Sequence, residues 1–175
     1  TLDAEDRAFL RAYLDDGRHL FITGQDIGWD LNASGSNNDP TFYHDYLHAT
    51  YINDDTNLYY LNGVAGDPVS DGMLLHIQGG DGANNQAYPS AIAPYDADAT
   101  EIFRYQGGAT PIGAIRSVDS GSGARVVYLA FGFEAIDNPT DRATMMDRAM
   151  GWLQNRIFAD GFEDATTSAW SMVTP

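Results

Sequence analysis

The sequence opens with a helical pattern that runs directly into a buried strand, and this order restricts the fold more than any other feature. Residues 3–16 place apolar side chains on one face, with acidic residues in the first turn and Gly17 beyond the end. This pattern is typical of an amphipathic helix with a glycine stop. Residues 19–23 are a short apolar run closed by Gly24, as expected of a buried parallel strand. The two segments form half of a βαβ unit, so we expect at least one further strand upstream.

The rest of the sequence favours one α/β domain and a tail. At 175 residues the chain is long enough for a single domain with a sizeable core. Further helices are expected at 41–51 and 140–156, and strands at 58–61, 72–77, 111–116 and 125–131. We therefore predict a doubly wound, mostly parallel sheet in residues 1–156, lacking its N-terminal strand or strands. Residues 157–175 are predicted to be a C-terminal tail.

Composition excludes several classes of function. The net charge is −16, and the nine basic residues are all arginine. Nucleic acids and anionic membranes are bound through clustered basic residues, so neither is an expected partner. The chain has no cysteine, which excludes disulfides, a thiolate nucleophile and a zinc–thiolate site. No apolar run is long enough to span a membrane.

The turn after the first strand is a candidate functional site. It reads Gly24-Gln25-Asp26-Ile27-Gly28, and glycines around a central residue are typical of a sharp strand-to-helix elbow. Such an elbow presents its central side chain at the carboxyl edge of the sheet, where open α/β folds bind ligands. We therefore expect Asp26 to lie at that edge.

This elbow resembles that of the class I glutamine amidotransferase-like family, whose motif is Gly-x-Cys-x-Gly with a later Phe-His-Pro-Glu. Asp26 stands in the position of the nucleophile, Gly132 in that of the histidine, and Glu134 in that of the acid. The resemblance implies a flavodoxin-like sheet whose catalytic site is degenerate.

A second resemblance concerns cellular context. Residues 13–28 and 132–136 are similar to amidotransferase-like domains appended to secreted bacterial proteins, often peptidases. Residues 157–171 are similar to the endings of exported proteobacterial proteins. These similarities imply an accessory or interaction domain of a secreted or periplasmic protein, with the other domains of that protein as its partners. Its export signal would lie outside this chain.

Asp26 and Glu134 leave more than one interpretation open. Two carboxylates at adjacent strand ends can divide acid and base roles, which with His44 would give a hydrolase, or they can hold a divalent cation. Alternatively, Asp26 caps the following turn and Glu134 accepts hydrogen bonds from the backbone amides of that turn.

Two further patterns suggest metals. His44 and His48 have the spacing of the zinc motif His-Glu-x-x-His, with Asp54 where an extended motif places a third ligand. A zinc peptidase is the less favoured hypothesis, because the surrounding aromatic residues predict a packing helix. Asp81 and Asn84 lie in a loop whose oxygens suit calcium, although turn formation explains them equally well. Several aromatic residues, by contrast, offer faces for a peptide or a sugar: Trp29, Tyr88, Tyr95 and Trp170.

Overall fold

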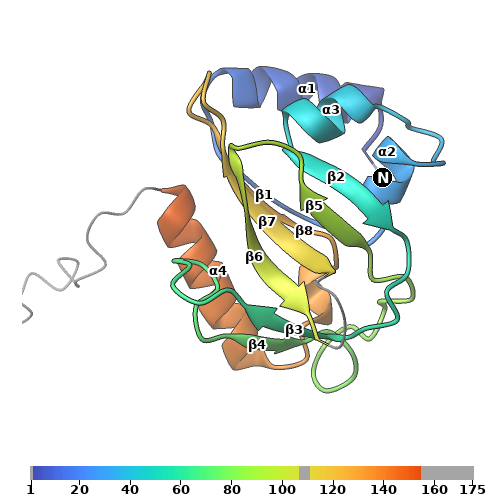
Figure 1. The fold of residues 1–175 in the computed structure, drawn as a ribbon, viewed down its shortest axis with the longest axis vertical. Helices are drawn as coiled ribbons and strands as arrows, with labels where there is room; N and C mark the ends of the chain where they lie inside the picture. The colour runs from blue at the N-terminus through green and yellow to red at the C-terminus, as the bar shows by residue number, and fades with distance from the viewer. Residues whose placement is uncertain (1, 107–110, 155–175) are drawn as a thin grey trace, which may run out of the picture.

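A single sheet with helices on both faces makes up the part of the chain that the computed structural model describes, residues 2–106 and 111–154 (Figure 1). The predicted tail 157–175 and Trp170 lie outside the described residues. The helices are α1 (Ala4–Asp15), α2 (Ile27–Asn32), α3 (Pro40–Asp45) and α4 (Pro139–Leu153), with a 3-10 turn at Phe133–Ala135. The strands are β1 (Leu20–Thr23), β2 (Ala49–Asn53), β3 (Tyr60–Gly63), β4 (Leu74–His76), β5 (Ala91–Pro94), β6 (Ala99–Tyr105), β7 (Ile112–Val118) and β8 (Arg125–Leu129). None of the described helices is long and apolar enough to cross a membrane.

The sheet is mixed and mainly antiparallel. Its strand order is β1-β8-β7-β6-β3-β4, and β5 joins it through β7 and pairs with β2. Only β1 and β8 pair in parallel, whereas every other pairing between described strands is antiparallel. The prediction of a doubly wound, mostly parallel α/β sheet of the flavodoxin and class I amidotransferase kind is therefore wrong.

The loops explain this difference. A parallel pair needs a crossover of about a dozen residues or more, usually a helix, whereas an antiparallel pair needs only a turn. β7 and β8 are joined by the turn 119–124, in which the Asp119 side chain accepts from the backbone amides of Gly121 and Ser122. Gly123 has φ of 75°, a conformation that favours glycine. This turn brings Val118 opposite Arg125 and fixes the register of the hairpin.

The predicted helix at 41–51 is also shorter than expected. It ends at Asp45, and residues 49–53 form β2 against β5. His48, between the two elements, has a left-handed backbone with φ of 52°, which does not continue a helix. The strands β5 and β6 were not predicted.

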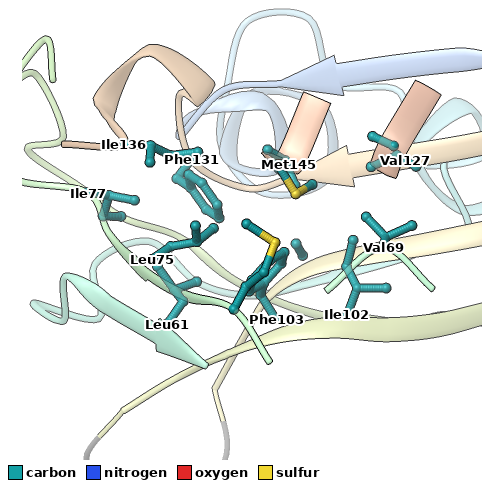
Figure 2. Packing of buried hydrophobic residues seen from close by; sticks show 14 of the residues in the cluster. Leu61, Val69, Leu75, Ile77, Ile102, Phe103, Val127, Phe131, Ile136 and Met145 are labelled. Atoms are coloured by element: carbon teal, nitrogen blue, oxygen red, sulfur yellow. The ribbon is translucent and has the colours of Figure 1, made fainter. Parts of the chain in front are cut away.

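Side chains of β8 alternate between two hydrophobic cores, one on each face of the sheet. Val127, Leu129 and the following Phe131 pack with α4 and with β3, β4 and β6. Figure 2 shows Phe131 and Met145 of this cluster facing Phe103 and Leu75. Val126 and Tyr128 pack on the opposite face with Leu14 of α1 and with α2 and α3. This alternation makes β8 a central strand.

Ion pairs tie α1 to the start of α3. Asp39, the N-cap of α3, accepts from Arg7 at 2.9 Å and from Arg11 at 2.9 Å. The arginines lower the pKa of Asp39 although burial opposes them. α1 is itself capped by Asp3, whose side chain accepts from the amides of Glu5 and Asp6. These contacts fix α1 and α3 side by side above the second core.

We expect Phe103→Ala to destabilise the protein by about 3–5 kcal/mol, because it removes a fully buried ring from the first core. Phe9→Ala is the matched control, since Phe9 is 69% exposed; it should change stability little. Urea denaturation measures both changes. Similar losses for the two variants would contradict the assigned core.

Candidate functional site

The elbow after β1 is formed as the sequence predicted, and α2 begins at Ile27. Gly28 is required by a close approach, because a Cβ atom there would lie 2.6 Å from the Tyr43 hydroxyl and 2.8 Å from the Tyr51 ring. Asp26 occupies the N-cap position of α2 but makes no side-chain capping hydrogen bond. Its carboxylate is therefore not explained by capping.

Asp26 belongs to a cluster of acidic and tyrosine side chains. Burial raises the pKa of Asp26, and the negative charges of Asp54 and Asp30 raise it further. Asp54 follows β2, and one of its carboxylate oxygens is buried without a hydrogen-bond partner. Burial and the neighbouring Asp54 also raise the pKa of the Tyr51 hydroxyl. A carboxyl group whose pKa is raised in this way is better suited to act as a proton donor.

Glu134 lies in different polar surroundings. Its carboxylate accepts a hydrogen bond of 2.8 Å from the Asn85 side chain and packs against Gly132. In the part of the chain that the structure describes, no hydrogen bond or ion pair joins Asp26 to Glu134. Neither carboxylate accepts the backbone amides that the turn interpretation requires.

The chain's own loop 85–90 covers the sheet edge at Gln25 and Gly132. The amide of Gly132 donates to Gln86 Oε1 at 2.9 Å, and the amide of Tyr88 donates to Gln25 Oε1 at 3.0 Å. The Ser90 hydroxyl donates to the Gln25 carbonyl, and Ser90 is fully buried. These bonds occupy polar groups of Gln25 and Gly132 with partners from the loop 85–90.

His44 and His48 do not share a helical face, because α3 ends between them. His44 stacks on Tyr95 at 4.2 Å between ring centroids, and its Nε2 lies 3.1 Å from the Asn32 amide nitrogen. His48 turns inward and is 4% exposed. Asp54 lies beside Tyr51 and Asp26 instead.

His48 has acidic partners that sequence spacing did not indicate. Its Nδ1 lies 2.9 Å from an Asp96 oxygen, and its Nε2 lies 3.7 Å from Asp119 Oδ2. Asp98 is close enough for His48, Asp96 and Asp98 to offer ligand atoms within 4.8 Å of one another. Asp96 follows β5, and Asp119 starts the β7–β8 turn. Both were missed because only the folded sheet brings these loops to His48.

The predicted calcium ligands are engaged by protein donors. Arg142 binds the Asp81 carboxylate at 2.7 Å and the carbonyl of the same residue at 3.1 Å. Asn84 Oδ1 accepts from the Gly79 amide. The three aromatic residues named for sugar or peptide contacts within the described chain are partly exposed: Trp29 at 39%, Tyr88 at 52% and Tyr95 at 49%.

Comparisons with known proteins give a fold but no family. No family model and no curated protein matches the chain. Among solved structures, the chain is similar to the cold-adapted β-galactosidase from Rahnella sp. R3, with a TM-score of 0.59 and 13% sequence identity. The match covers 87% of this chain and 21% of that chain. The likeness shows a shared fold and gives no evidence for an amidotransferase.

We expect Asp26→Asn to stabilise the protein near neutral pH. The folded-state pKa of Asp26 is raised, so its ionisation costs stability as the pH rises through that pKa. The gain should shrink as the pH falls below this value, because both proteins are then neutral at residue 26. Thermal unfolding across pH measures the difference, with exposed Asp147→Asn as control. A gain in Tm that persists at low pH would contradict the cause.

We expect Gln86→Ala to cost about 1–3 kcal/mol, because it leaves the buried Gly132 amide without an acceptor. Asn62→Ala in β3 removes an acceptor from the exposed side-chain amide of Gln106 and should cost less. Chemical denaturation measures both. Equal costs would show that the covering loop contributes little to stability.

Proposed function

We propose that this chain is a non-catalytic accessory or interaction domain of a larger exported bacterial protein, with a secreted peptidase as the parent. The observation that carries the proposal is the loop 85–90, which fills the sheet edge at Gln25 and Gly132 with its own hydrogen bonds. A substrate at that edge would have to displace buried polar contacts, and leaving such groups unpaired is costly.

Two further observations support an accessory role. The similar β-galactosidase contains this fold as about a fifth of its chain, at 21%, so the fold also occurs as one part of a larger enzyme. The sequence similarity of residues 13–28 to domains appended to secreted bacterial proteins supports export and a peptidase as the parent. The partners would then be other domains of the same protein.

A hydrolase is the second candidate, and the raised pKa of Asp26 favours it. The hypothesis needs a different partner from the one the sequence suggested, because Glu134 binds Asn85 and His44 contacts Asn32. Among the neighbouring carboxylates, Asp54 has the largest electrostatic effect on the pKa of Asp26. In this alternative Asp26 serves as the proton donor and Asp54 as the base.

Substitution in the full-length parent protein separates the two candidates. For an accessory domain, Asp26→Ala and Glu134→Ala should leave turnover unchanged, as should Asp16→Ala at an exposed control site. Circular dichroism checks that each variant is folded. Turnover that is abolished in a folded Asp26→Ala protein, but retained in Asp16→Ala, would overturn the accessory role and support the hydrolase.

A further inference from the structure

His48 lies at the wall of a cavity between α1, α3 and the β7–β8 turn. The cavity has a volume of about 260 Å³, and Asp15, Asp45 and Asp119 also line it. His48 is 4% exposed and has φ of 52°. A non-glycine residue in this region persists only when its surroundings enforce it, and such strain clusters at binding and catalytic sites.

Asp96 determines which nitrogen of His48 is available. Its carboxylate lies 2.9 Å from Nδ1, and a carboxylate accepts hydrogen bonds, so Nδ1 carries the proton of the neutral ring. The lone pair of a neutral imidazole is then on Nε2. A histidine that donates one N–H to a carboxylate and offers its other nitrogen is the usual arrangement of a metal-binding imidazole.

The distance between His48 Nε2 and Asp119 Oδ2 is close to the distance between two ligand atoms that bind the same cation. His48 Nε2 lies 3.7 Å from Asp119 Oδ2, which is too long for a hydrogen bond. Two metal–ligand bonds of about 2.1 Å at a tetrahedral angle place their ligand atoms about 3.4 Å apart. Among the described residues Nε2 makes no hydrogen bond, so no donor competes for its lone pair.

Asp119 can supply this ligand without losing its structural role. Its Oδ1 accepts from the Gly121 amide at 3.1 Å and from the Ser122 hydroxyl at 2.8 Å. Those contacts hold the β7–β8 turn, while Oδ2 faces His48. One carboxylate oxygen thus stabilises the turn, and the other is available to bind a ligand.

The charges around the cavity favour a cation. Asp15 and Asp45 line the same space, and the positive charge of Arg11 is directed to Asp39 by hydrogen bonds of 2.9 and 3.0 Å. Asp96 and Asp98 add negative charge on the other side of the ring. An ion on that side would have to break the His48–Asp96 hydrogen bond, so the Nε2 side is the better site.

We propose that His48 Nε2 and Asp119 Oδ2 bind a divalent transition-metal cation, with Zn²⁺ as the best match to one imidazole and carboxylate ligands. Asp96 orients the imidazole from the outer shell. Water molecules complete the coordination. This site does not depend on the accessory role proposed above, nor on the His44 and Asp54 positions of the predicted zinc motif.

Thermal unfolding with ZnCl₂ as the probe tests the proposal. At a free zinc concentration about 100 times the Kd, the Tm of this chain should rise by roughly 5–10 °C. Isothermal titration should give one zinc per chain. His48→Asn and Asp119→Asn should abolish both signals; asparagine tolerates the left-handed backbone at residue 48 and keeps an acceptor oxygen for the turn at residue 119.

Three controls make the test specific. His44→Asn and His76→Asn should bind zinc as the unsubstituted chain does, because both histidines lie outside the cavity lining. Asp96→Asn should weaken binding by about 10- to 100-fold, as expected of an outer-shell partner.

Two results would overturn the proposal. The first is an absence of zinc binding by the folded, unsubstituted chain. The second is zinc binding that survives Asp119→Asn. If Asp98→Asn abolishes that binding instead, the ion lies on the Nδ1 side of His48 and the proposed site is wrong. Circular dichroism confirms folding of each variant, and Asp119→Asn remains decisive if His48→Asn fails to fold.

Discussion

Burial of β8 on both faces is the constraint on which the rest of the structure depends. Each of its residues from Val126 to Leu129 is at most 2% exposed, and successive side chains enter opposite cores. A strand with two apolar faces must be covered twice. α4 with β3 and β4 provides one cover, and α1, α2 and α3 provide the other. Its two edges are filled by β1 in parallel and by β7 in antiparallel pairing.

The sequence predicted segments with strong local periodicity. The structure confirms helices near 3–16 and 140–156, within the described residues, and strands near 19–23 and 125–131. The predicted relative direction of the strands was wrong. A helix followed by a buried strand suggested repeated βαβ units, but the polar turn at 119–124 allows only a hairpin. The sequence of this turn, Asp-Ser-Gly-Ser-Gly-Ala, is rich in turn-forming residues. It favours a hairpin over the helical crossover that a parallel strand would need.

The candidate sites were predicted only in part because their members come from separate loops. Asp26 was identified from its elbow, but Asp54 reaches it only because β2 follows α3 in place of a longer helix. The His44–His48 spacing drew attention to His48 without joining it to Asp96 or Asp119. Those aspartates lie in the loop between β5 and β6 and in the turn after β7, and the antiparallel pairing of β6 with β7, which sets Ala99 opposite Ser117, brings the two loops together. The spacing of residues along the sequence does not indicate which strands pair.

The divided carboxylate of Asp119 couples the cavity to the backbone of the sheet. One oxygen anchors the amides of Gly121 and Ser122, and the other faces His48. A cation bound beside the second oxygen would withdraw electron density from the first and so weaken the hydrogen bonds that it accepts from both amides. Hydrogen–deuterium exchange at Gly121 and Ser122 would then report on binding in the cavity through the backbone of the hairpin tip.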